Sequence, residues 1–206
     1  MRKTASFLLL ASLFVLGGCQ AIFTYSPLSG LQRDPASMSP AQRLTYAQNA
    51  LDSGDATAMQ KAYDAIKNDT SAAAQYTAAL LGIELSGVPT LLRQSVSNPS
   101  NVTTDLNGIQ AFIANNNLQP ALMVAAYGQL ANAAAAGQVL APMDYVMGSM
   151  GFLLGNTGGT WDITHATAGS GAAAQAILAQ ANIASLPSGD LKTFLTDYNT
   201  YLGMLP

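Results

Sequence analysis

Residues 39–55 read SPAQRLTYAQNALDSGD and contain the start, the apolar face and the end of one helix. The Ser39 hydroxyl can cap the first turn, and Pro40 fits the first helical position because no N–H is needed there. Gly54 is the residue type that most readily ends a helix in the left-handed conformation. The apolar residues between them recur at helical spacing: Leu44, Ala47 and Leu51. The stretch therefore predicts a helix that begins at Pro40 and stops at Gly54.

The same signals repeat along the rest of the chain. Asp55 can cap a second helix, and Gly87 can end a third. Pro120 opens another helix, and Pro142 opens the segment PMDYVMGSMGFLLG, which is apolar on most sides. Helices of that kind lie at the centre of a bundle. The segment is too short to cross a membrane, which takes ~20 apolar residues, so we expect it to be core, together with methionines such as Met147.

Helical spacing also defines the remaining predicted faces. They are Met59, Ala62, Tyr63 and Ile66; Ala73, Tyr76, Leu80 and Ile83; Leu106, Ile109, Phe112 and Ile113 after a cap at Thr104; Met123, Tyr127, Leu130 and Ala134; and Leu191, Phe194, Leu195, Tyr198 and Leu202 after a cap at Asp190. No β-branched run with a period of two is long enough to predict a strand. The sequence thus predicts an all-α fold of about eight to nine helices, stacked as antiparallel hairpins.

Two glycines suggest an internal repeat. Gly54 and Gly87 lie 33 residues apart, a period typical of helical-hairpin solenoids. The stretch YAQNALDSGDATAMQKAYDAIKND resembles a degenerate tetratricopeptide unit, with Tyr63 at the position of a packing aromatic and alanines where helices cross. The resemblance covers residues 42 to 87, after which the period drifts. An irregular helical bundle accounts for the same pattern, so both architectures stay open.

The N-terminal segment predicts where the protein resides. Two basic residues precede an apolar stretch of ten residues, Phe7 to Leu16, a pattern typical of a signal peptide rather than a membrane span. Leu16-Gly17-Gly18-Cys19 resembles the lipobox of bacterial lipoproteins. The resemblance implies cleavage between Gly18 and Cys19, followed by attachment of diacylglycerol and an N-acyl chain such as palmitate to Cys19, the sole cysteine. No other cofactor is expected.

These expectations divide the chain into three parts. Residues 1–18 form the signal peptide, residues 19–39 the lipidated N-terminus and a Pro/Gly-containing tether, and residues 40–206 a single helical domain. The lipid chains would anchor the domain to a membrane without spanning it. Gln20 replaces the aspartate that retains such lipoproteins at the inner membrane. The resemblance therefore implies an outer-membrane anchor with the domain in the periplasm.

Charge is scarce and uneven. Only 9% of residues are charged, against about 25% in soluble domains, and no lysine or arginine lies between Gln94 and Leu191. The part after Gly18 carries six basic and eleven acidic residues, a formal charge of −5. Nucleic acid requires a basic surface, so it is not an expected partner. The uncharged region is either covered by a partner or by membrane headgroups, or solvated by its Asn, Gln, Ser and Thr residues.

Few residues point to catalysis or metal binding. The chain has a single histidine, His165, so no histidine-rich metal site is expected. The loop from Gly155 to Gly171 places Trp161 and Asp162 near that histidine, which makes the three residues a speculative site. A histidine in a polar loop is more often simply solvated, and a tryptophan there more often anchors the loop to the helices. The sequence lacks a nucleophile elbow, a phosphate-binding loop and a dinucleotide fingerprint.

The remaining enzyme hypothesis involves Glu84. Helical envelope lipoproteins include lytic transglycosylases, which use one glutamate as a general acid, and Glu84 is the sole glutamate here. The chain lacks the serine that follows that acid in those enzymes and the downstream G-L-M-Q-like stretch, so the likeness is one of class alone. We therefore expect a non-catalytic scaffold or adaptor for an envelope assembly, secretion or transport machine. A carrier of a small apolar ligand is the second hypothesis, and a murein-acting enzyme the third.

Overall fold

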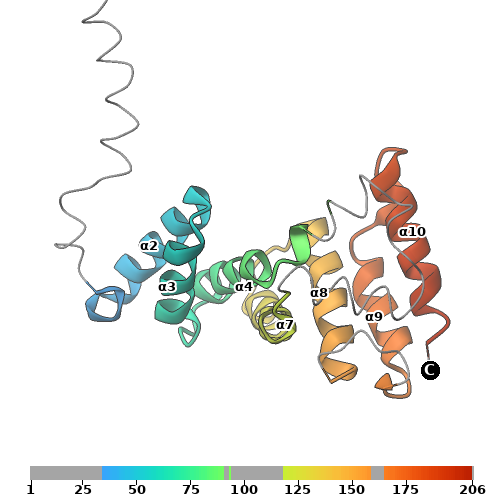
Figure 1. The fold of residues 1–206 in the computed structure, drawn as a ribbon, viewed down its shortest axis with the longest axis horizontal. Coiled ribbons are helices and arrows are strands. Elements are labelled where there is room, and N and C mark those ends of the chain that lie inside the picture. The colour runs from blue at the N-terminus through green and yellow to red at the C-terminus, as the bar shows by residue number, and fades with distance from the viewer. Residues whose placement is uncertain (1–33, 91–92, 94–117, 159–164, 206) are drawn as a thin grey trace, which may run out of the picture. The chain divides into compact units, whose positions relative to one another are not determined.

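The computed structural model describes residues 34–90, 93, 118–158 and 165–205. All regular secondary structure in these ranges is helical, which confirms the predicted all-α class (Figure 1). The α-helices are α2 (Pro40–Ser53), α3 (Ala56–Ile66), α4 (Ala72–Ser86), α7 (Pro120–Ala135), α8 (Pro142–Asn156), α9 (Ser170–Ala179) and α10 (Asp190–Leu202). Two 3-10 helices, η2 (Pro35–Ser37) and η5 (Ile183–Ser185), accompany them. None of the helices in the described ranges combines the length and the apolar character needed to cross a bilayer.

By its internal contacts the chain divides into two units, Met1–Ser37 and Met38–Pro206. The described part of the first unit is the short segment around η2. The second unit contains every α-helix from α2 to α10. The helix predicted after Thr104 lies outside the described residues.

The helix boundaries follow the capping signals in the sequence. Ser39 forms a capping box with Gln42, and Pro40 is the first residue of α2. The Asp55 carboxylate accepts the Ala58 amide at 2.7 Å at the start of α3. Gly54 and Gly87 end α2 and α4 in the left-handed conformation, with φ of 67° and 79°. A side chain would strain the backbone at both positions, which explains the two glycines.

One predicted cap lies elsewhere. The N-cap of α10 is Gly189, and Asp190 is already the first helical residue. The backbone of Gly189 is extended, and the first turn of α10 has no side-chain capping hydrogen bond from this residue. The prediction at Asp190 was therefore one residue too late.

Most helices pack against their neighbours in the described chain. The contacts run from α2 to α3, α4, α7, α8, α9 and α10 in that order, and α2 also contacts α4. Figure 1 shows this succession from the blue helix α2 to the red helix α10. The most extensive contact joins α4 and α7. Serial packing of this kind occurs in helical solenoids and in irregular bundles, the two architectures that the sequence left open.

Two hydrophobic clusters meet at α4. The smaller cluster joins α2, α3 and α4: Ala47, Ala50, Met59, Ala62, Tyr63, Ile66, Ala78 and Leu81. The larger cluster contains Ala79 and Ile83 of α4 and extends through α7, α8 and α9 to α10. Consequently α4 is buried on most sides, whereas the sequence predicted a single face that included the exposed Ala73.

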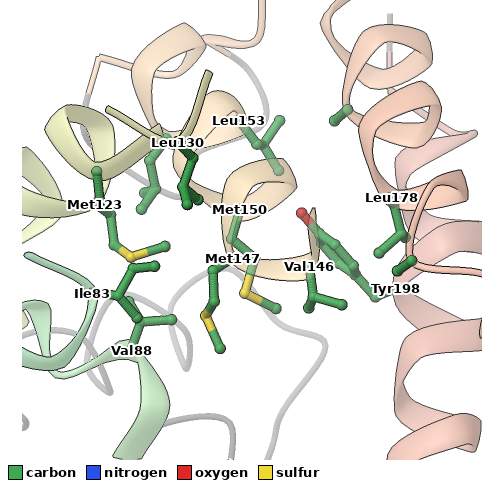
Figure 2. Close-up of a cluster of buried hydrophobic side chains, with 14 of the residues drawn as sticks. Ile83, Val88, Met123, Leu130, Val146, Met147, Met150, Leu153, Leu178 and Tyr198 are labelled. Atoms are coloured by element: carbon green, nitrogen blue, oxygen red, sulfur yellow. The ribbon is translucent and has the colours of Figure 1, made fainter. Parts of the chain in front are cut away.

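Helix α8 is central to the larger cluster, as predicted. Figure 2 shows its residues Val146, Met147, Met150 and Leu153 among side chains from α4, α7, α9 and α10. Met147 and Met150 are buried core residues. The helix approaches α7 closely at Gly151, where an added Cβ would lie 2.5 Å from the Met123 carbonyl oxygen. Glycine is required there by the spacing of the two helices.

Candidate functional site

The predicted site residues are largely outside the described ranges. Gly18 and Cys19 precede residue 34, and Trp161 and Asp162 fall within 159–164. His165 is exposed at the end of that gap. The loop that follows is fixed to the end of α8, because the Thr167 hydroxyl donates to Asn156 Oδ1 at 2.9 Å. The proposed grouping around His165 therefore stays a prediction.

Glu84 is exposed in the last turn of α4. Its backbone carbonyl accepts the capping amide of Gly87. General-acid catalysis by a carboxyl group at neutral pH requires a raised pKa, which burial or a neighbouring negative charge produces. Glu84 lies at the surface, where carboxyl groups are typically solvated. Among the described residues no three His, Cys, Asp or Glu side chains lie close enough to hold a metal ion.

Charged side chains gather on the first three described α-helices. The charged surface, as we call it, consists of the exposed charged residues of α2, α3 and α4 with the residues that flank α3: Asp52, Asp55, Lys61, Asp64, Lys67 and Glu84. Lys67 donates to Asp64 at 2.7 Å and lies 5.8 Å from the ring centre of Tyr63. The bonds from Lys67 and from Gln60 lower the pKa of the Asp64 carboxyl. This surface therefore carries both signs of charge in water.

A chain of polar contacts runs beneath the charged surface. The Arg43 guanidinium donates to both carboxylate oxygens of Asp69, at 2.8 and 3.3 Å, and both side chains are partly buried. Gln75 donates to the backbone carbonyl of Asp69 and accepts from Asn132 of α7 at 3.4 Å. The chain thus connects α2, the α3–α4 connection, α4 and α7. Sequence reasoning missed it, because its partners are as many as 57 residues apart.

The next three α-helices are different. Within residues 118–158 and 165–189, Asp144 is the only Asp, Glu, Lys or Arg. It is 6% exposed, and its Oδ2 accepts the Tyr76 hydroxyl at 2.9 Å and the Ala141 amide at 2.7 Å. Burial, followed by the bond to Asp144, raises the pKa of the Tyr76 phenol. We call the exposed side chains of α7, α8 and α9 and of the α7–α8 loop the uncharged surface.

The most prominent apolar residues of the uncharged surface lie around the loop between α7 and α8. Val139 is 84% exposed, and Met143 in the first turn of α8 is 38% exposed. Leu140, between them, packs against the larger hydrophobic cluster. Gly137 begins the loop in the left-handed conformation, with φ of 90°. The loop is therefore attached to the core at Leu140 while Val139 faces outward.

The geometry indicates two surfaces of different chemistry on one helical unit. One carries charges of both signs on α2–α4, and the other lacks exposed charged side chains on α7–α9. The sequence signal for the second surface was the absence of Lys and Arg between Gln94 and Leu191. In comparisons with protein-family models, curated proteins and solved structures, nothing matches the chain.

Proposed function

We propose that this protein is a lipid-anchored, periplasm-facing lipoprotein of the outer membrane that acts as a non-catalytic adaptor for an envelope assembly, secretion or transport machine. Cys19 would carry the lipid chains, residues 20–39 would serve as the tether, and the helical unit would bind the partner. The proposed localisation at the outer membrane depends on the Leu16–Cys19 lipobox and on Gln20.

The observation that carries the adaptor proposal is the separation of charge between α2–α4 and α7–α9. Soluble domains distribute about 25% charged residues over their surface. An adaptor must contact two different surroundings, and two surfaces of different chemistry support such a role. The charged surface suits an envelope protein with charges of its own, because complementary charges select partners and set the association rate.

Photo-crosslinking in cells tests the adaptor role. A photoreactive amino acid would replace Lys61, an exposed residue of α3. In the matched control, the same amino acid would replace Gln180, which is exposed just after α9. We expect Lys61 to give a discrete crosslinked product with one envelope protein, and we expect Gln180 to give none. The yield of the crosslinked product should fall when Cys19→Ala removes the anchor, because tethering raises the local concentration of the domain.

Native mass spectrometry of the purified lipoprotein separates the alternatives. A bound protein partner supports the adaptor. A small apolar adduct that survives purification would instead support the carrier hypothesis. Cleavage of purified murein that is lost in Glu84→Gln would contradict a non-catalytic role.

A further inference from the structure

The exposed tip of the α7–α8 loop offers apolar side chains where nothing in the described structure covers them. Val139 and Met143 are exposed, and the neighbouring Ala141 and Pro142 are exposed as well. Leu140 holds the loop against the core, so the tip has a defined position on the helical unit. Insertion of such a tip into a surface would cost little conformational entropy.

The helices on either side of this tip, α7 and α8, also lack exposed charged side chains. A charged side chain resists transfer out of water, and carboxylates are repelled by anionic lipid headgroups. The only Asp, Glu, Lys or Arg in residues 118–158 and 165–189 is Asp144, which is buried and bonded to Tyr76. Of the exposed carboxylates in the described chain, Asp52, Asp55, Asp64 and Glu84 belong to the charged surface, whereas Asp34 precedes α2 and Asp197 lies on α10. The part of the unit around Val139 is therefore the part that approaches an anionic bilayer with the least repulsion.

The length of the tether favours a membrane over a protein as the occupant. Only residues 20–38 separate Cys19 from the Ser39 cap of α2, and a chain of that length spans at most about 65 Å when fully extended. A lipid anchor at Cys19 would hold the helical unit near the bilayer, where even a weak contact is populated because it is intramolecular. A stable protein interface buries about 1,200–2,000 Å², which two protruding side chains do not provide.

From these observations we propose that the α7–α8 loop rests on the lipid surface, with Val139 and Met143 inserted among the headgroups. The inference depends on the proposed function, because the anchor at Cys19 brings the loop to the membrane. It assigns the uncharged surface to the lipid and leaves the charged surface of α2–α4 free to meet the protein partner.

Spin labels on the full-length lipidated protein test the contact. With Cys19 acylated, Val139→Cys provides the sole thiol for a nitroxide, and Thr57→Cys on exposed α3 is the matched control. The protein is reconstituted in phosphatidylethanolamine–phosphatidylglycerol vesicles. We expect the label at residue 139 to collide less with a water-soluble nickel chelate, and more with oxygen, than the label at residue 57.

A second variant tests the apolar side chains of the tip with a spin label placed outside the tip. The nitroxide is attached at Ala134→Cys, an exposed position near the end of α7, and Val139→Asp and Met143→Asp are added. We expect these changes to return the label at residue 134 to water. Both substituted side chains are exposed, so the helical unit should keep its fold, which circular dichroism checks.

The possible failures are distinguishable. Protein that does not sediment with the vesicles contradicts the anchor, and with it the proposed function. Protein that sediments while the labels at residues 139 and 57 are equally accessible to the nickel chelate contradicts the loop contact alone. Protection of residue 139 from the nickel chelate that is already present in an unanchored Cys19→Ala variant, in buffer without vesicles or detergent, would reveal a protein neighbour or a second copy and would also overturn the lipid contact.

Discussion

The Tyr76 hydroxyl of α4 donates a hydrogen bond to the Asp144 carboxylate of α8 at 2.9 Å. The same oxygen accepts the Ala141 amide at 2.7 Å, so one buried carboxylate caps α8 and connects it to α4. A buried charge is stable only when it is paired or hydrogen-bonded. These two hydrogen bonds therefore explain how Asp144, the one charged residue of α7, α8 and α9, can be buried.

Removing the Tyr76 hydroxyl should destabilise the fold. Hydrogen bonds to charged groups contribute about 1.5–3 kcal/mol, so we expect Tyr76→Phe to lower the free energy of unfolding by an amount in that range. Asp144→Ala should cost more, because it also removes the cap of α8. Urea unfolding of both single variants and the double variant gives the coupling energy. Additive losses would show that the two residues do not interact in solution.

The close approach of α8 to α7 at Gly151 leads to a second prediction. An alanine Cβ at residue 151 would clash with the Met123 carbonyl oxygen, whereas nothing lies within 4 Å of the corresponding position at residue 128 of α7. Overpacking costs about 1–3 kcal/mol, and alanine in place of glycine in an open helical position stabilises by roughly 0.5–1 kcal/mol. Gly151→Ala should lower the melting temperature, and Gly128→Ala should raise it. Equal effects would contradict the described packing.

Tyr198 should make the fold sensitive to alkali. Burial raises the pKa of the Tyr198 phenol well above 10.0, against the opposing effect of a bond with Ser149. The folded state thus favours the protonated phenol, and the stability it contributes is present below pH 10 and is lost as the pH rises toward the folded pKa. We expect the unfolding free energy to fall above pH 10, and to fall less in Tyr198→Phe. Phenolate absorbance during titration provides an independent check.

Two ion pairs of the described helices and their connections should differ in importance. Arg43 and Asp69 are partly buried, and Arg43 also donates to the Met38 carbonyl oxygen at 3.1 Å. Lys67 and Asp64 are exposed in water, where ion pairs contribute little. Arg43→Ala should therefore lower the free energy of unfolding by about 1.5–3 kcal/mol, and Lys67→Ala far less. Chemical denaturation measures both, and a larger loss in Lys67→Ala would contradict the assignment.

Local signals in the sequence predicted most of the described helices. Ser39, Asp55 and the glycines at 54 and 87 act within one turn of their own position, so their roles depend little on the rest of the fold. The apolar segment after Pro142 is indeed at the centre of the core. The face of α4 was predicted less well, because a helix between two clusters has no single apolar face to read.

Contacts between residues far apart in the chain could not be predicted from the sequence. The bond from Tyr76 to Asp144 joins residues 68 apart, and the bond from Asn132 to Gln75 joins residues 57 apart. No spacing rule connects positions on helices that meet only in the folded chain. The uncharged surface was visible as composition, but its arrangement around the exposed Val139 required the structure.

The central claim, that this helical unit works at a membrane through Cys19, is tested most directly by the mass of the N-terminal tryptic peptide from membrane-purified protein. We expect a peptide from Cys19 to Arg33 that carries a diacylglyceryl group and an N-acyl chain, and we expect the Cys19→Ala variant to leave the membrane fraction. An unmodified Cys19 thiol, or a Cys19→Ala variant that is still processed after Gly18 and still membrane-bound, would contradict it.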